Sequence, residues 1–160
     1  MSAAVLSRDP GLVAAVDRHL DLQVESARRL LELVLRQGSA IRERDTEAVL
    51  ARLAEIKTEM AARENLERER SGLIATAAAR LGTGADGVTL SALAGLMSEG
   101  EAAELEARSA ELRGLLGEIG REHGINRALM RQELTFLDHL LRLVGEPDAG
   151  GGNRLMDVEA

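Results

Sequence analysis

Three glycines, Gly82, Gly84 and Gly87, have the spacing that lets a backbone approach the pyrophosphate of a dinucleotide. That use requires a strand before the glycines and the N-terminus of a helix directly after them. Here a leucine-rich helical pattern precedes Gly82, and no strand pattern is available. Segment 82–87 is therefore interpreted as a connecting loop in preference to a nucleotide site.

Histidines and carboxylates are the other side chains that could perform chemistry. His19, His123 and His139 are scattered, and none belongs to a His-x-x-x-His or Glu-x-x-His pair of the kind that holds zinc or di-iron centres. Cysteine is absent, which removes disulfides, thiolate nucleophiles and cysteine-ligated metals. The many carboxylates fall on helical faces expected to be solvated, where nothing raises a pKa for acid–base work. We predict no catalytic residue, no cofactor and no metal ion, and hence a protein that is not an enzyme.

The hydrophobic residues indicate an all-α fold. They make up 45% of the 160 residues, yet there is no Trp, no Tyr and a single Phe, whereas sheets favour aromatic and β-branched residues. A chain dominated by Leu, Ala, Glu and Arg is typical of helical bundles and coiled coils. The only prolines are Pro10 and Pro147, so no obligatory helix breaker lies between them.

The charge balance bears on partners. A formal net charge of −7, with no basic stripe interleaved with aromatic residues, disfavours nucleic acids and anionic membranes. No apolar run approaches transmembrane length, and the N-terminus lacks the pattern of a signal peptide. A cytoplasmic location without stable membrane insertion is the expectation.

The first half of the chain predicts two long helices. Asp9 can cap a helix in which Pro10 occupies the first turn, and this helix continues to about Arg44. A heptad seam follows its start, with Gly38 at one register position and apolar residues at the others: Leu20, Val24, Ala27, Leu31, Val34 and Ile41. Asp45 marks a new start, either a break or only a kink, and the second helix ends near Leu81 after a highly charged middle at 61–72.

The second half predicts a short helix and the longest one. An apolar stretch at 90–97 precedes Ser98 and Glu101, which have the spacing of a capping box. A helix then runs to Gly145. Three long helices with short connections predict an elongated antiparallel bundle or coiled coil at 1–145, followed by a flexible acidic tail at 146–160.

Four glycines, Gly114, Gly117, Gly120 and Gly124, interrupt the last helix. Each costs about 1 kcal/mol relative to alanine in a helix interior. One interpretation is close approach of a neighbouring backbone, and the other is a softened segment that re-forms around a partner. The sequence favours neither.

The last turns of this helix are the best candidate for a binding surface. Leu137, Leu140 and Val144 continue its seam, and packing against the first helix is the favoured interpretation for them. Leu134, Phe136 and Leu141 are more than a two-residue stripe requires. That surplus could line a groove or hold a partner helix.

Taken in order, these features resemble the FlgN family of flagellar export chaperones. The resemblance rests on three stretches: 30–34 through 45–50 and 56–60, then Thr89–Leu93, and Asn126–Met130 leading to 133–141. The third is the most specific and is similar to the family's asparagine-initiated C-terminal helix. The family often has a tyrosine-containing tail motif, which this chain lacks. Leu155, Met156 and Val158 are left as a short docking element in the tail.

The resemblance implies a cytoplasmic chaperone without a cofactor. Such proteins bind the helical terminal segments of hook–filament junction (hook-associated) proteins, prevent their early association and present them to the flagellar type III export apparatus. The client-binding residues it implies, together with the apolar surplus, are Asn126, Met130, Leu134, Phe136, Leu137, Leu140, Leu141 and Val144. The alternative is a structural coiled coil or assembly scaffold that self-associates, and a homodimer remains open.

Overall fold

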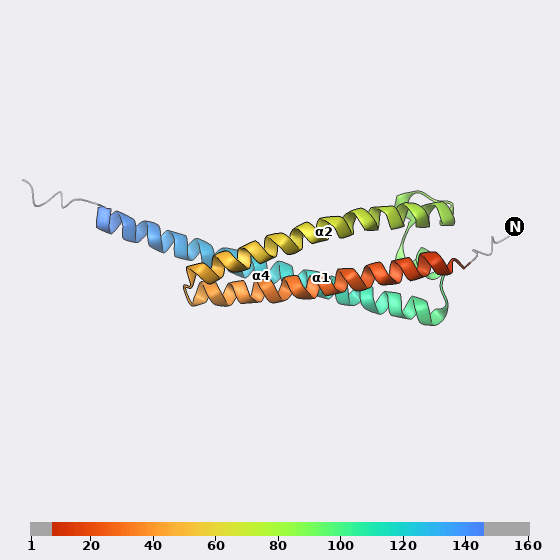
Figure 1. Cartoon of the computed structure of the whole chain (residues 1–160), viewed down its shortest axis with the longest axis horizontal. Coiled ribbons are helices and arrows are strands. Elements are labelled where there is room, and N and C mark those ends of the chain that lie inside the picture. Colours follow the sequence, from red (N-terminus) through yellow and green to blue (C-terminus); the bar gives the residue numbers. More distant parts are fainter. Residues whose placement is uncertain (1–7, 146–160) are drawn as a thin grey trace, which may run out of the picture.

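A computed structural model describes residues 8–145 of the 160-residue chain. Its elements are α1 (Pro10–Arg42), α2 (Thr46–Leu81), the 3-10 turn η1 (Ala85–Gly87), α3 (Leu90–Ala94) and α4 (Glu99–Gly145). The long helices α1, α2 and α4 lie along one another (Figure 1), and the described residues include no strand. The all-α prediction is confirmed. The predicted tail, with Leu155, Met156 and Val158, lies outside the described residues.

The predicted helix starts are formed by side-chain caps. Asp9 and Asp45 each accept a hydrogen bond from a backbone amide in the first turn of their helix, at 3.1 and 3.0 Å. Before α4, the Glu101 amide donates to the Ser98 hydroxyl at 3.2 Å, and the Ser98 amide donates to the Glu101 carboxylate at 3.1 Å. This reciprocal pair satisfies amides that would otherwise lack partners at the start of the helix.

The first two helices are separate. α1 ends at Arg42, within two residues of the predicted end, and the chain reverses before Asp45 caps α2. Among residues 8–145, Arg44 is the only residue other than glycine with a positive φ, at 55°. A left-handed residue at this point turns the chain back on itself, so the junction is a break that forms a helical hairpin.

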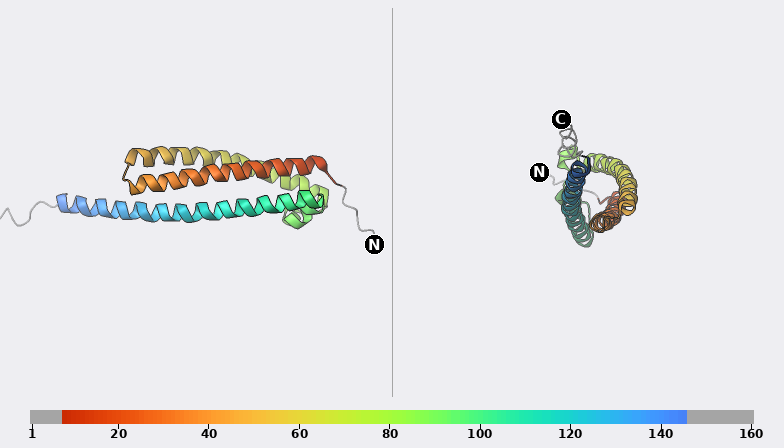
Figure 2. Two further views of the ribbon diagram at one scale, coloured as in Figure 1. Left: turned by 90° about the horizontal axis from the view of Figure 1, so that it is seen from below. Right: turned by 90° about the vertical axis from the view of Figure 1, so that its left-hand side faces the viewer.

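The order of contacts along the rods gives the topology. Asp9 pairs with Arg80 while Ser26 bonds Glu59, so α1 and α2 run antiparallel. In the hydrogen bonds between α1 and α4, the α4 residue lies 83 to 92 residues farther along the chain than its α1 partner, so these two helices run parallel. Because the chain reverses twice, successive long helices are antiparallel as predicted, and α1 and α4 are parallel (Figures 1 and 2).

α1 carries the core. Its buried apolar residues are Leu12, Val13, Val24, Ala27, Leu30, Val34, Ala40 and Ile41. By contrast, α2 buries Ala77 and Ala78, and α4 buries Leu105 and Asn126. α1 packs against both other rods, whereas α2 and α4 scarcely touch each other. The bundle is therefore open on the side between α2 and α4.

Candidate functional site

A buried amide fixes α4 on α1. Asn126 is only 3% exposed, and its Nδ2 donates a hydrogen bond to the backbone oxygen of Val34 at 2.8 Å. Gly38 lies opposite, where a Cβ atom would come within 2.6 Å of Asn126 Oδ1. The glycine in the α1 seam therefore makes room for the asparagine. Asn126, predicted to touch a client, is enclosed by the chain's own helices.

The tip of the hairpin makes further contact with α4. The guanidinium Nε of Arg44 lies 3.5 Å from Glu133 Oε1, and its Cζ lies 5.5 Å from the centre of the Phe136 ring. α4 then continues to Gly145, about 14 Å farther at about 1.5 Å per residue. Both side views show this helix extending past the hairpin (Figures 1 and 2). We call residues 134–145 the projecting end.

The projecting end presents large apolar side chains to solvent. Their exposed fractions are Leu134 61%, Phe136 46%, Leu137 51%, Leu140 39%, Leu141 69%, Leu143 63% and Val144 83%. The favoured interpretation that Leu137, Leu140 and Val144 pack against the first helix is wrong, because α1 has ended before α4 reaches them. Met130, just before the projecting end, is 37% exposed.

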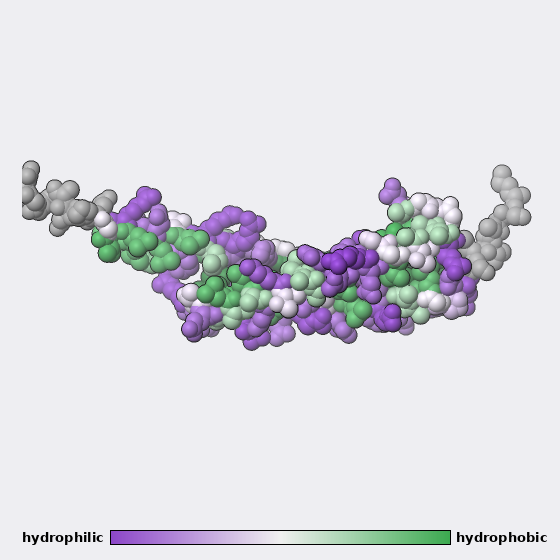
Figure 3. Space-filling view, turned by 45° about the horizontal axis from the view of Figure 1, so that its top comes forward, coloured by the Kyte–Doolittle hydropathy of each residue, from purple (hydrophilic) through white to green (hydrophobic). Residues whose placement is uncertain are grey.

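These side chains continue a seam. Leu134, Leu137, Leu141 and Val144 follow one another at spacings of three and four, so they share one side of the helix. Figure 3 shows apolar atoms gathered on this end of α4, with charged groups beside them. Arg142 and Asp138, which pair at 3.1 Å, are among those charged groups. Leu143 also belongs to this surface, although it is not among the predicted client-binding residues.

The glycines of α4 do not mark close packing within the chain. A Cβ atom added at Gly114, Gly120 or Gly124 would meet nothing within 4 Å, and at Gly117 only the flexible guanidinium of Arg121. Close approach of another helix of this chain is therefore wrong as an explanation. A softened segment, or close approach of a helix from another protein, remains as the interpretation.

The charged middle of α2 forms a polar layer against α1. The Arg63 guanidinium donates to the Ser26 hydroxyl and to Gln23 Oε1, both at 3.2 Å. The Ser26 hydroxyl in turn donates to Glu59 at 2.7 Å. Burial raises the pKa of Glu59, but hydrogen bonds from Ser26 and Arg29 and the charges of Arg29 and Arg63 outweigh it, so the pKa is lowered. Part of the charged middle of α2 thus holds α2 against α1.

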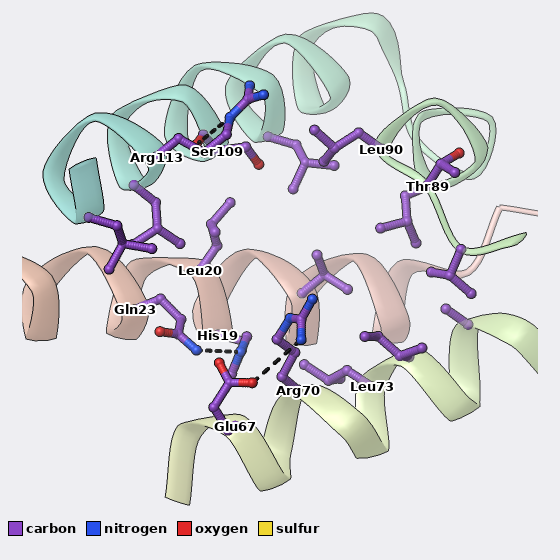
Figure 4. A pocket seen from close by; sticks show the side chains of 18 of the residues that line it. His19, Leu20, Gln23, Glu67, Arg70, Leu73, Thr89, Leu90, Ser109 and Arg113 are labelled. Atoms are coloured by element: carbon purple, nitrogen blue, oxygen red, sulfur yellow. Dashed lines mark hydrogen bonds and ion pairs between the residues drawn. The ribbon is translucent and has the colours of Figure 1, made fainter. Parts of the chain in front are cut away.

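A groove lies at the opposite end of the bundle from the projecting end. It has a volume of about 580 Å³ and is lined by α1, α2, α4 and the segment from Val88 to Leu93 (Figure 4). Leucine, isoleucine and valine side chains dominate its walls, with His19, Gln23, Arg63, Glu67, Arg70 and Arg113 among its polar members. Sequence reasoning missed this groove, because its opening depends on α2 and α4 remaining apart.

The glycine-rich segment 82–87 follows α2 and contains η1. Gly82 caps the end of α2 with a φ of 65°. A helix, and not a strand, therefore precedes this loop. Within residues 8–145, no group of three or more His, Asp or Glu side chains is placed to hold a metal ion. No helix in that range is both long enough and apolar enough to cross a membrane.

Comparison with known proteins gives one result. The family described as FlgN protein matches residues 12–154. Neither the curated proteins nor the solved structures include a match to this chain. Because the family match covers most of the sequence, the protein belongs to the FlgN family, whose general role is that of a flagellar export chaperone.

Proposed function

We propose that the projecting end binds the helical terminal segment of a hook–filament junction protein in the cytoplasm and holds it until the flagellar export apparatus receives it. One observation carries this proposal: the apolar seam of α4 continues after the hairpin that packs against it has ended. Exposed apolar surface of this kind typically marks a protein-binding site.

The physical logic is that of a helix laid against a helix. A client segment with its own apolar stripe would associate prematurely, and covering that stripe with the projecting end hides both surfaces. Fully burying a leucine contributes about 1.5–3 kcal/mol, and about 1.4 kcal/mol corresponds to a tenfold change in affinity. Two leucines of the projecting end are therefore enough to control client capture.

A matched pair of variants tests the proposal. Leu134→Ser/Leu141→Ser removes two side chains exposed by 61% and 69%, whereas Leu50→Ser removes one exposed by 60% on α2. Calorimetric titration with a purified junction-protein segment should show at least tenfold weaker binding for the first variant and unchanged binding for the second. Equal affinities for all three proteins would overturn the proposal.

Truncations separate the projecting end from the tail. Deleting 131–160 should abolish client capture, and deleting only 146–160 should retain it. If the shorter deletion also abolishes capture, the tail residues Leu155, Met156 and Val158 carry the client and not the projecting end.

The same exposed seam supports a second candidate, a coiled-coil scaffold that self-associates through the projecting end. Light scattering of the full chain distinguishes the two functions. A monomer whose mass does not change with concentration contradicts the scaffold, whereas growing assemblies that form without a client contradict the chaperone.

A further inference from the structure

We propose that the groove between α2 and α4 is a second docking site, which receives an acidic amphipathic helix of a partner protein. The site is distinct from the projecting end. Leu112 in the groove and Leu137 in the projecting end are separated by about 38 Å of helix at about 1.5 Å per residue. The two surfaces can therefore be occupied by different segments.

The shape of the groove suits one helix. α1 forms its floor with Val16 and Leu20, and the Val88–Leu93 segment closes one end (Figure 4). The α2 wall runs from Arg63 to Ala77, about 21 Å, and the α4 wall from Leu105 to Leu116, about 16 Å. These lengths correspond to three to four helical turns. An added helix would supply the fourth rod that the open side of the bundle lacks.

The apolar lining indicates how such a helix would orient. Leu73 and Ile74 on α2 and Leu112 and Leu116 on α4 lie on the two walls. Leu116 remains 41% exposed, although it lies on the groove side of α4. A helix with leucines at spacings of three and four would place its apolar stripe between these walls.

Charge selects the occupant. The groove is lined by Arg63, Arg70 and Arg113 and by a single carboxylate, Glu67, although the whole chain has a net charge of −7. Arg70 and Arg113 belong to opposite walls; Arg70 pairs with Glu67 at 3.4 Å, and the Nε of Arg113 donates to the backbone oxygen of Ser109 on its own helix at 3.4 Å (Figure 4). Carboxylates flanking the apolar stripe of the incoming helix would complement both.

The chain's own segments fit less well. The projecting end carries one acid, Asp138, and one base, Arg142, which pair with each other, so it has no net charge to complement the arginines of the groove. The tail at 146–160 is acidic but begins about 44 Å beyond Leu116. Fully extended, its residues span at most about 54 Å, which is too short for it to lie along the groove. A helix from another protein is the occupant that both charge and reach favour.

Two synthetic peptides test the proposal on the full chain. Both are fourteen-residue helices (about four turns) with the same leucine stripe, flanked by glutamates in one and by lysines in the other. Fluorescence anisotropy should show saturable binding of the glutamate peptide, at least tenfold tighter than that of the lysine peptide. Equal affinity for the two peptides, or no binding of either, would overturn the proposal.

Charge variants locate the binding. Arg70→Glu/Arg113→Glu should reverse the preference between the peptides. Arg121→Glu/Arg127→Glu changes the net charge by the same amount on residues that do not line the groove, and should preserve the preference. If both variants act alike, the peptide responds only to overall charge and the groove is not the site.

The outcome is independent of the proposed function. Leu134→Ser/Leu141→Ser should leave binding of the glutamate peptide unchanged, and Arg70→Glu/Arg113→Glu should leave capture of the junction-protein segment unchanged. Loss of peptide binding in the leucine variant would place the peptide on the projecting end and contradict a second site.

Discussion

Replacing Gly38 with alanine tests how α4 is held on α1. In an isolated helix the change would stabilise by about 1 kcal/mol, because glycine is the poorer helix former. Here the new Cβ atom would lie 2.6 Å from Asn126 Oδ1, closer than atoms can approach, so the Asn126 side chain must move. Its hydrogen bond to the Val34 oxygen would break.

The magnitude follows from these two opposing effects. A buried amide left without its partner costs about 1–3 kcal/mol. Set against the gain in helix propensity of about 1 kcal/mol, Gly38→Ala should range from neutral to about 2 kcal/mol destabilising. In an Asn126→Ala background the clash is absent, and the same change should stabilise by about 1 kcal/mol.

Urea unfolding of the four proteins of this double-mutant cycle provides the measurement. The coupling energy between Gly38 and Asn126 should be about 1–3 kcal/mol. Gly120→Ala is the control, because its Cβ would meet nothing within 4 Å, and it should stabilise both backgrounds equally. A coupling below about 0.5 kcal/mol, which is the scatter expected of independent sites, would refute the reasoning.

Three further predictions concern the hairpin and the glycines. Folding lowers the pKa of Glu59 from 4.5, so as the pH falls below 4.5 the unfolded state binds more protons and the free energy of unfolding decreases. Urea unfolding at several pH values should show a shallower decrease for Glu59→Gln than for the unchanged protein. Identical pH dependence of the two proteins would contradict this prediction. Arg44→Ala and Arg44→Gly both lose the contacts with Phe136 and Glu133. Arg44→Ala should destabilise the fold more, because only glycine adopts the φ of 55° without strain. A lower unfolding temperature for Arg44→Gly than for Arg44→Ala would exclude strain at this position. Gly114→Ala/Gly120→Ala/Gly124→Ala should raise the unfolding free energy by about 3 kcal/mol and weaken client binding in calorimetry, and unchanged affinity would exclude the softened segment.

Local chemistry made the helix boundaries predictable. Helix starts are indicated by Asp9, by Asp45 and by the pair Ser98 and Glu101, because each cap is formed by residues close in sequence. Most of the α1 seam was predictable because apolar spacing is a property of one helix, although α1 buries Leu30 where the pattern indicated Leu31. The sequence did not distinguish a break from a kink at Asp45. The left-handed turn is formed by Arg44, and arginine is not a residue type that indicates a left-handed conformation.

Features that depend on two helices were harder to predict. Gly38 and Asn126 lie 88 residues apart, and only the parallel packing of α1 and α4 brings them together. The seam at Leu137, Leu140 and Val144 predicts a partner, but not that α1 stops before reaching it. The groove exists because α2 and α4 remain apart. The periodicity of apolar residues within either helix does not predict that separation.

Hydrogen–deuterium exchange of the full chain, with and without a purified junction-protein segment, tests client binding at the projecting end most directly. Backbone amides at the end of an exposed helix exchange readily, and a bound client helix should slow them. We predict new protection concentrated in 134–145, with the α1–α2 hairpin little changed. Client binding that leaves exchange in 134–145 unaltered would contradict the central claim.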